Sequence, residues 1–235
     1  MTLPVAILAG GIATRLRPTT ETIPKSLIEV AGRPFLFHQL EWLREEGVER
    51  VVLCVGHLGE KIRAAVGDGT AWGLAIGYSS DGDRLLGTGG ALRKAASKLG
   101  DQFFVLYGDS YLCCSLADVE RAFRTAGKPA LMTVLKNDGR WDRSNVDFGE
   151  GGRVRYDKHN PTLEMRYIDY GLSVMRADVL AHCGEDDVFD LADVLADLSA
   201  RNDLAALEVT DRFYEIGSPA GLKETEEFLL KMVKR

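Results

Sequence analysis

The sequence predicts an α/β fold in which a mainly parallel sheet carries helices on both faces. Short apolar runs alternate with helical patterns along the first 135 residues. Four runs are continuous rather than alternating, as is typical of strands buried on both faces. They are Val5–Ala9, Val51–Val55, Phe103–Tyr107 and Ala130–Leu135. Strands that alternate with helices imply βαβ units, in which neighbouring strands run parallel.

Helical patterns separate these strands. The three helices expected in this half are Pro34–Glu46, Thr88–Lys98 and Ser115–Thr125. The first begins with proline, which suits a first helical turn, and stops before Gly47. In the third, Ser115 and Asp118 have the spacing of a capping box, so the helix should begin there.

The pattern changes after about residue 136. A hairpin is expected around Gly149–Gly152, and a last helix that Ser218 and Pro219 open. A further helix is expected over residues 190–200. The strands expected here are Val146–Phe148, Arg153–Lys158, Tyr167–Met175, Leu204–Val209 and Phe213–Ile216. We interpret this part as a smaller β-rich lobe inserted into the sheet or laid over it.

The composition is that of an ordinary acidic globular domain. The 235 residues are 46% hydrophobic and 27% charged. A net charge of −6 disfavours a nucleic-acid binder that relies on a broad basic surface. No run of eighteen apolar residues occurs, and the N-terminus has no charged n-region or cleavage site, so neither a membrane span nor a leader is expected. The four cysteines lack C-x-x-C spacing, which favours free thiols in a reducing cytoplasm.

The segment after the first strand has the composition of a phosphate-binding loop. Gly10 and Gly11 leave the backbone N–H groups unshielded, so that they can approach anionic oxygens closely. Arg15 adds a planar fork that suits phosphate, and Lys25 adds a compact positive charge. Together they predict a site for a nucleoside triphosphate.

Two other interpretations of this loop fit the sequence less well. An ordinary βα turn would use the glycines only for close packing. A dinucleotide-binding turn needs G-x-G-x-x-G opening into a helix, but Gly10 and Gly11 are adjacent and the third glycine is missing. Pro18 and Pro24 would also interrupt that helix. Glu29 lies about where a ribose-binding acid belongs, but this one residue is not enough to indicate a dinucleotide site. The Walker A pattern is absent as well.

Residues 5–27 resemble the signature of the sugar-1-phosphate nucleotidylyltransferases, G-x-G-T-R-L-x-P-x-T followed by P-K-P. The matching residues here are G-I-A-T-R-L-R-P-T-T and Pro24-Lys25. Ala13 stands where the family usually has glycine, and Ser26 where it usually has proline. If position 13 needs a positive φ, alanine costs about 1 kcal/mol there.

The resemblance covers nearly the whole chain and implies its architecture. The expected fold is α/β, a Rossmann-like three-layer sandwich with a mainly parallel mixed sheet and a small β-rich sugar-binding lobe. Residues 1–235 would form a single nucleotidyltransferase domain, with a nucleotide-binding part over 1–135, a sugar-binding part over 136–217 and a C-terminal helix over 218–235. The hexapeptide β-helix array that some relatives carry is not present in this sequence.

The nucleotide site implied by the resemblance combines the first loop with a second glycine-rich segment. Leu86-Gly87-Thr88-Gly89-Gly90-Ala91 enters a helix, and relatives use such a loop for base and ribose. A tight helix start is the alternative, although three glycines in four residues exceed what it requires. The predicted nucleotide-binding residues are Leu8, Ala9, Gly10, Gly11, Thr14, Gly87, Thr88 and Gly89.

Asp109 is the candidate ligand for Mg²⁺. It follows the strand Phe103–Tyr107, and ligands of open parallel sheets gather at the carboxyl ends of strands. Mg²⁺ needs only one or two carboxylates plus substrate phosphates, so one aspartate suffices as an anchor. The alternative is a turn or helix-capping aspartate. Relatives carry a second ligand in a W-x-D-x-G-like motif, which here reads Phe213-Tyr214-Glu215-Ile216-Gly217. Glu215 is therefore a second candidate ligand, with a solvated strand-end acid as its alternative.

The resemblance also places the sugar phosphate. Lys158 ends a segment that in relatives meets the sugar phosphate, with a solvated lysine as the alternative. Asp169, Tyr170 and Gly171 lie on the strand that contacts the sugar in relatives. The cluster Arg140–Asp142 with Ser144 and Asn145 could bind sugar hydroxyls, or form an ordinary hairpin loop with one anchoring aromatic residue.

The implied reaction joins a nucleoside triphosphate to a sugar 1-phosphate and releases pyrophosphate. Arg15 would clamp the β,γ-phosphates, Lys25 would lie between the α-phosphate and the sugar phosphate, and Asp109 would hold the metal. The pattern is most similar to guanylyltransferases for manno-configured sugars or heptose 1-phosphates. Uridylyltransferases for N-acetylmuramate 1-phosphate, cytidylyltransferases for phosphocholine or phosphonates, and a non-catalytic nucleotide sensor remain alternatives. The oligomeric state, a homo-oligomer included, stays open.

Overall fold

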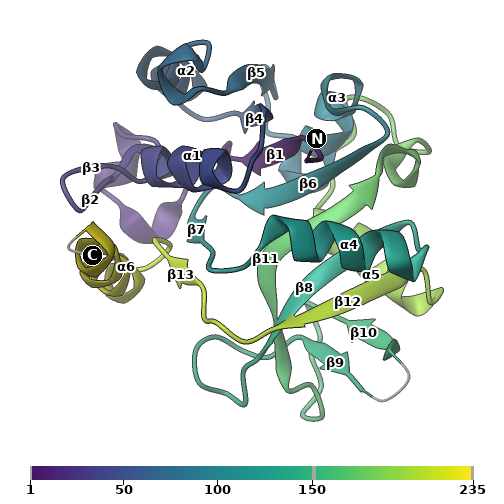
Figure 1. The fold of residues 1–235 in the computed structure, drawn as a ribbon. Helices are drawn as coiled ribbons and strands as arrows, with labels where there is room; N and C mark the ends of the chain where they lie inside the picture. Colours follow the sequence, from purple (N-terminus) through teal and green to yellow (C-terminus); the bar gives the residue numbers. More distant parts are fainter. Residues whose placement is uncertain (1, 150–151, 234–235) are drawn as a thin grey trace.

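A nine-stranded sheet runs through the computed structural model of the protein, which describes residues 2–149 and 152–233 (Figure 1). Its strands follow the order β10-β9-β11-β6-β1-β4-β5, and β8 lies between β11 and β12. The strands are β1 (Val5–Leu8), β4 (Arg50–Val55), β5 (Ala75–Ser80), β6 (Gln102–Tyr107), β8 (Ala130–Lys136), β9 (Val146–Phe148), β10 (Val154–Tyr156), β11 (Tyr167–Arg176) and β12 (Leu204–Val209).

The sheet is mixed and mainly parallel along its nucleotide-side half, as predicted. Strands β6, β1, β4 and β5 pair in parallel, and β12 pairs in parallel with β8. Strand β11 runs antiparallel to both β6 and β8, and its pairing with β8 shifts register between Asp169 and Ser173. The carboxyl ends of β1, β4, β5 and β6 therefore meet at one edge of the sheet.

Six α-helices and several short elements complete the described chain. The helices are α1 (Phe35–Glu45), α2 (Gly59–Val66), α3 (Gly87–Leu99), α4 (Leu116–Ala126), α5 (Leu191–Ala200) and α6 (Pro219–Val233). The 3-10 turns are Thr14–Leu16, Thr19–Glu21, Lys25–Leu27, Thr70–Trp72 and Ala177–Leu180. Two small ladders pair β2 (Glu29–Val30) with β3 (Arg33–Pro34), and β7 (Ser110–Tyr111) with β13 (Tyr214–Glu215).

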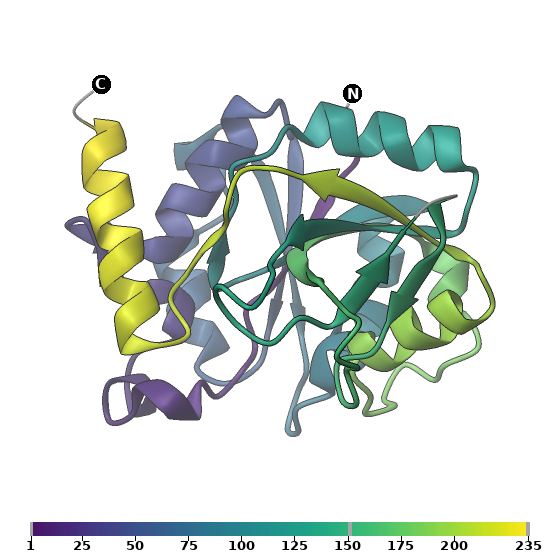
Figure 2. The same cartoon turned by 90° about the horizontal axis from the view of Figure 1, so that it is seen from below.

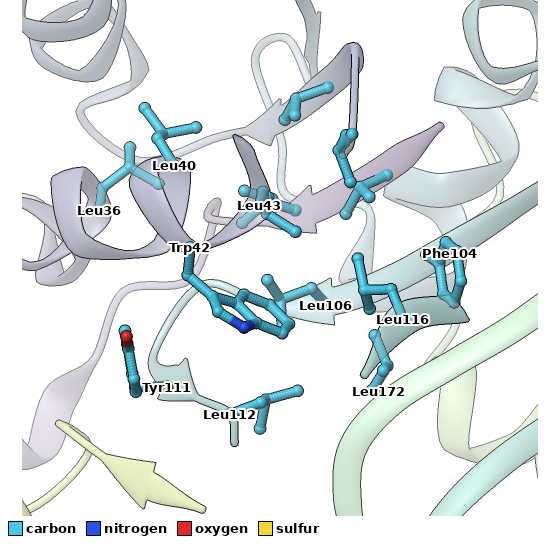
Figure 3. Close-up of a cluster of buried hydrophobic side chains, with 14 of the residues drawn as sticks. Leu36, Leu40, Trp42, Leu43, Phe104, Leu106, Tyr111, Leu112, Leu116 and Leu172 are labelled. Carbon is cyan, nitrogen blue, oxygen red and sulfur yellow. The ribbon is translucent and has the colours of Figure 1, made fainter. Parts of the chain in front are cut away.

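Two separate cores, one on each face of the sheet, make the molecule a three-layer sandwich (Figure 2). Val5 and Ile7 of β1 join the core that holds α1, α2 and α4, whereas Ala6 between them joins the core that holds α3 and α5. This alternation follows from the two-residue period of a strand. Figure 3 shows part of the first core, where Trp42 of α1 lies near Leu106 of β6. The predicted three-layer α/β fold is confirmed.

The longest elements that the sequence analysis missed are α2 and β5; it also did not predict the two-residue strands β2, β3 and β7. Strand β5 pairs with β4 alone among the described strands, and most of its side chains are partly exposed. An edge strand of this kind lacks the continuous apolar run that reveals a central strand. Helix α2 has only eight residues, which is too short for a clear helical period.

The chain after residue 136 does not stand apart from the main sheet. Strands β9 and β10 form a hairpin, and β9 also pairs with β11, which continues into the centre of the sheet. The expected turn at Gly149–Gly152 includes residues 150 and 151, which lie outside the described residues.

Strand β13 is shorter than the predicted Phe213–Ile216. Helix α6 packs beside β2 and β13 (Figure 1). The ring of Phe228 on this helix stacks on Tyr214 of β13, with 3.9 Å between the ring centroids. Among the described helices, we find none whose length and apolar character would let it cross a membrane.

Candidate active site

The loop after β1 is held close to the loop after β4. The Gly10 carbonyl accepts a hydrogen bond from His57 N–H at 3.2 Å, and a Cβ on Gly10 would lie 2.9 Å from the backbone nitrogen of Gly56. Gly10 is thus required by packing between two backbones. A Cβ on Gly11 would meet nothing within 4 Å, so this glycine leaves its backbone open toward the adjoining cavity.

Ala13 adopts the left-handed conformation that the resemblance suggested for this position, with φ 52° and ψ 53°. The buried hydroxyl of Thr20 donates to its carbonyl at 2.9 Å, which helps to hold the turn. Alanine in this region costs about 1 kcal/mol relative to glycine. The loop therefore places an alanine in a turn conformation that glycine would favour.

A first cavity of about 250 Å³ opens at the carboxyl ends of β1, β4 and β6. Most of the predicted nucleotide-binding residues line it. They are Leu8, Ala9, Gly10, Gly11, Gly87 and Thr88, together with Lys25 and Asp109. Thr14 and Gly89 are not part of its wall. The sequence analysis did not assign several other residues of the wall to the site, among them Ser26, Cys54 and Asp81.

A second, larger cavity of about 660 Å³ lies beside the first. It is lined by all four predicted sugar-phosphate residues, Lys158, Asp169, Tyr170 and Gly171, and also by Arg15 and Glu215. Tyr107 and Asp109 line both cavities. The two spaces therefore meet at the end of β6.

Lys25 and Asp109 form an ion pair at this junction. Lys25 Nζ lies 2.5 Å from Asp109 Oδ2, and the two side chains are 16% and 34% exposed. Arg15 is close by, because a Cβ on Gly217 would lie 3.0 Å from Lys25 Nζ and 3.3 Å from Arg15 Nη2. Within residues 2–149 and 152–233, the Arg15 guanidinium makes no ion pair. The three residues predicted to act in catalysis thus converge where the cavities meet.

The carboxylate of Glu215 is engaged by the start of α6. It accepts hydrogen bonds from Gly217 N–H and from the hydroxyl of Ser218, the latter at 2.7 Å. Ser218 in turn caps the helix by accepting from Gly221 N–H at 3.0 Å, as its position before Pro219 predicted. Glu215 borders the second cavity, but its oxygens are already used to hold this turn. Its role as a metal ligand stays a prediction.

The fit of Asp109 to a metal ion rests on the ion pair. A carboxylate that holds an ammonium at 2.5 Å is an anionic site able to hold a cation, and it faces both cavities. Among the described residues no group of three or more His, Cys, Asp or Glu side chains comes together. The donor set therefore suits Mg²⁺, which completes its shell with substrate phosphates and water, and does not suit a fully protein-bound metal.

The glycine-rich start of α3 is crossed by the segment before α5. Gly89 N–H donates to the Phe189 carbonyl at 3.0 Å, and a Cβ on Gly89 would overlap the ring of Phe189. A Cβ on Gly90 would overlap the carbonyl of Asp187 in the same way. These two glycines are accounted for by close packing. A Cβ on Gly87 would likewise overlap the Phe189 carbonyl, but Gly87 and Thr88 also line the cavity.

Asp190 links a residue of the first cavity, Thr88, to a residue of the second, Lys158, and the sequence analysis did not identify it. Its carboxylate accepts from the Thr88 hydroxyl at 2.6 Å and from Lys158 Nζ at 3.1 Å. Burial opposes its ionisation, but hydrogen bonds from Thr88, Ala192 N–H and Lys158 outweigh burial, so the pKa of Asp190 lies below its ordinary value. The available signal was its place at the start of the helix expected over residues 190–200, which does not by itself indicate a site.

An aromatic wall lies on one side of the second cavity. The ring of Phe213 packs edge-on against Tyr170 at 5.7 Å and near Trp141 at 6.5 Å. Arg212 lies over Trp141 and forms an ion pair with Glu224 at 2.7 Å. The Tyr170 hydroxyl accepts from Cys113 N–H at 2.9 Å, so Tyr170 offers its ring rather than its hydroxyl to the wall. The sequence had singled out Trp141 but neither Arg212 nor Phe213 as a part of this wall.

Asp169 is the acid of the second cavity whose pKa is raised. Burial raises its pKa to about 6, although Gly171 N–H and the charge of Lys158 act in the opposite direction. Gly171 N–H donates to Asp169 Oδ1 at 3.0 Å, and Gly171 has a φ of 96°, which a glycine tolerates. A half-buried carboxyl that faces a polar cavity suits the recognition of sugar hydroxyls.

We expect Asp169→Asn to stabilise the protein at pH 8. Because the folded-state pKa is raised, the wild type loses stability as pH rises from about 4 to about 6, and the loss is complete above that range. Asparagine keeps an acceptor for Gly171 N–H and never ionises, so the gain should be on the order of 2 kcal/mol at pH 8 and vanish below about pH 4. Urea unfolding across this pH range measures it. Asp147→Asn, at an exposed site on β9, is the matched control. Equal stability of Asp169→Asn and wild type at pH 8 would contradict the expectation.

Residues 5–155 match the sequence profile of a family described as Nucleotidyl transferase. A glucose-1-phosphate thymidylyltransferase of Streptomyces antibioticus is 42% identical over 130 residues, which cover 55% of this chain and 36% of that protein. The chain therefore spans about a third of the length of that relative. An N-acetylmuramate alpha-1-phosphate uridylyltransferase of Neisseria meningitidis is 29% identical over 228 residues, covering 94% of this chain and 95% of that protein.

Solved structures share the fold. The crystal structure of HddC from Yersinia pseudotuberculosis, complexed with GMP-PN, superposes with a TM-score of 0.79 over 97% of this chain and all of that chain, at 23% identity. The profile match extends from the first strand, through the phosphate loop and Asp109, to β10. With the site geometry described above, these similarities identify the chain as a member of the nucleotidyl transferase family.

Proposed function

We propose that the protein is a sugar-1-phosphate nucleotidylyltransferase. The observation that carries the proposal is the junction of two cavities at Asp109, where Lys25 and Arg15 bring positive charge between a narrow glycine-lined space and a wider polar one. A nucleotide suits the first space, and a sugar phosphate beside aromatic rings and Lys158 suits the second. Relatives named as thymidylyl-, uridylyl- and guanylyltransferases for sugar 1-phosphates support this assignment.

In the proposed reaction an oxygen of the sugar phosphate attacks the α-phosphorus of the nucleotide. A new P–O bond forms, the bond between the α-phosphorus and its bridging oxygen breaks, and pyrophosphate leaves with the electron pair. The attacking oxygen is already anionic, so no general base is required. Catalysis then consists of alignment and charge stabilisation.

Each charged residue at the junction has its own role in this reaction. Lys25 orients the α-phosphate against the incoming sugar phosphate, and Arg15 stabilises the charge that grows on pyrophosphate. Lys158, held by Asp190, binds the sugar phosphate. Members of the family generally use a divalent metal, and Asp109 would hold Mg²⁺, which supplies further charge neutralisation when bound.

Two substrate pairs are favoured by specific relatives. Mannose-1-phosphate guanylyltransferase subunits of Drosophila pseudoobscura pseudoobscura and Danio rerio align over 91% of this chain, in support of GTP with a manno-configured sugar or heptose 1-phosphate. The Neisseria relative favours UTP with N-acetylmuramate 1-phosphate instead. We propose the first pair, in the cytoplasm, where the four free cysteines would stay reduced.

A substrate panel tests the proposal. The protein is incubated with each of GTP, UTP, dTTP, CTP and ATP against mannose, heptose, glucose and N-acetylmuramate 1-phosphates and phosphocholine, with Mg²⁺, and pyrophosphate release is measured. Release should require one sugar phosphate and be abolished by Lys25→Ala. Absence of pyrophosphate with every pair, under conditions in which nucleotide binds, would leave a nucleotide sensor as the better assignment.

We also expect transfer to be direct, without a covalent nucleotidyl-enzyme. Cys54 is the thiol in the first cavity, and burial raises its pKa to about 12, so it stays protonated and a poor nucleophile. Initial rates over a grid of both substrate concentrations should give intersecting reciprocal plots. Parallel plots, or a nucleotide that stays on the denatured protein after incubation with labelled triphosphate alone, would contradict direct transfer.

A further inference from the structure

Asp81 is a buried carboxylate in the wall of the first cavity that the proposed reaction does not use. It follows β5, is 8% exposed, and is the first residue of the loop that leads to α3. Its Oδ2 accepts a hydrogen bond from Leu86 N–H at 3.2 Å. In the described part of the chain Oδ1 makes no hydrogen bond, so an acceptor remains available.

Positive charge near Asp81 does not neutralise this carboxylate directly. Lys94 Nζ donates a hydrogen bond to the main-chain oxygen of Asp81 at 3.2 Å, and it forms an ion pair with Asp186. Burial raises the pKa of Asp81, while Leu86 N–H and the charge of Lys94 act in the opposite direction. The group therefore gains from a ligand that donates hydrogen bonds to it.

The position of Asp81 separates it from the phosphates. Asp109 follows β6 and Asp81 follows β5, and β1 and β4 lie between these two strands. With about 4.8 Å between neighbouring strands, the two ends are about 14 Å apart along the sheet edge. Phosphates need the cations at the Asp109 end and would be repelled by an unpaired carboxylate. The nucleobase is the part of the nucleotide left for the Asp81 end.

Ser26 gives a second sign that polar ligand atoms belong in this cavity. It is 3% exposed and lines the cavity, and its hydroxyl finds no hydrogen-bond partner among the described residues. A buried polar atom without a partner costs free energy that a bound ligand can recover.

We infer that Asp81 selects guanine, by accepting two hydrogen bonds from its Watson–Crick edge. Guanine presents two adjacent donors there, N1–H and the 2-amino group, which match the two oxygens of a carboxylate. Uracil and thymine present one donor between two acceptors, and cytosine and adenine place an acceptor beside their amino group. Each of these would set a carbonyl or ring nitrogen lone pair against a carboxylate oxygen. The inference rests on the proposed function and fixes the base that this site takes.

Base preference in the wild type and in Asp81→Asn tests the inference. In the wild type, kcat/KM for GTP should exceed that for UTP, dTTP, CTP and ATP at least tenfold. Inosine triphosphate, which lacks only the 2-amino group, should also be about tenfold poorer than GTP. Asp81→Asn presents a donor beside an acceptor, so it should lower kcat/KM for GTP about 10- to 100-fold and bring the ratio of GTP to inosine triphosphate close to one.

A structural role of Asp81 is distinguished by stability and by a matched variant. Asparagine can still accept from Leu86 N–H, so the melting temperature should stay within a few degrees while the base ratio changes. Asp83→Asn, two residues away and exposed, should keep the guanine preference. A wild type that prefers uracil or thymine, or an Asp81→Asn protein that keeps the preference for GTP, would overturn the inference.

Failure of the proposed function is recognised separately. If no pair of substrates releases pyrophosphate, isothermal titration of wild type with GDP, inosine diphosphate and UDP still measures the preference for the base. At least tenfold tighter binding of GDP than of the other two supports the role of Asp81, and equal affinities refute it. This reading of the wild type does not depend on whether Asp81→Asn folds.

Discussion

Lys25→Ala is expected to lower turnover at least about a hundredfold, and Arg15→Ala should do the same. Each variant would remove a proposed charge-assisted phosphate contact, which should strengthen as charge moves toward pyrophosphate in the transition state. Loss of one such contact typically costs a factor of about 10² to 10³. Lys25 sits where the two cavities meet, and Arg15 reaches the same point from the second cavity.

The fold should survive both changes. The Lys25–Asp109 pair is partly exposed, and Arg15 holds no ion pair within the described residues, so neither side chain supports the core. Pyrophosphate release at saturating substrates measures turnover, and thermal unfolding checks the fold. Arg17→Ala, in the same loop, and Lys98→Ala, on the exposed side of α3, are matched controls expected to keep normal rates. A near-normal rate for Lys25→Ala or Arg15→Ala would remove the proposed phosphate site.

Asp109→Asn is expected to be nearly inactive at millimolar Mg²⁺, whereas Glu215→Gln should lose no more than about tenfold. Asp109 borders both cavities and holds a cation already, so loss of its charge weakens metal binding and also releases Lys25. The carboxylate oxygens of Glu215 accept hydrogen bonds from Gly217 N–H and the Ser218 hydroxyl, and glutamine retains one acceptor oxygen for that turn. We therefore expect Asp109 to hold the metal and Glu215 to stabilise the start of α6.

A Mg²⁺ titration distinguishes these roles. Pyrophosphate release is measured from micromolar to tens of millimolar Mg²⁺ for wild type and both variants. Asp109→Asn should need far more metal or stay inactive, and Glu215→Gln should keep the wild-type midpoint with a lower plateau. Full activity of Asp109→Asn, or of the wild type in excess chelator, would rule out the metal assignment. A raised midpoint for Glu215→Gln would show that this residue is a ligand after all.

The core of the fold and the centre of the site follow from local patterns. Buried parallel strands appear as continuous apolar runs, which is why β1, β4, β6 and β8 were predicted close to their observed bounds. The phosphate loop and Asp109 each follow directly on such a strand. Their placement at one sheet edge needed only the rule that the carboxyl ends of parallel strands meet.

The sequence also determined conformations within a few residues of a motif. Ala13 occupies the left-handed region that a family glycine would favour, and Ser218 caps α6. Such features depend on φ, ψ and hydrogen bonds between near neighbours, so a short segment contains all the information that they need.

Only the tertiary structure decided which side chains meet across long stretches of chain. Lys25 pairs with Asp109 across 84 residues, and Thr88 with Asp190 across 102. The same is true of Gly89, whose missing side chain makes room for the ring of Phe189, 100 residues further along the chain. Asp81, at the end of an edge strand with no apolar run, gave no signal until the cavity placed it beside the glycine loop. Hydrophobic periodicity encodes burial and local geometry, but the partner of a polar side chain depends on strand order and on packing between distant segments, which the pattern of a single segment does not contain.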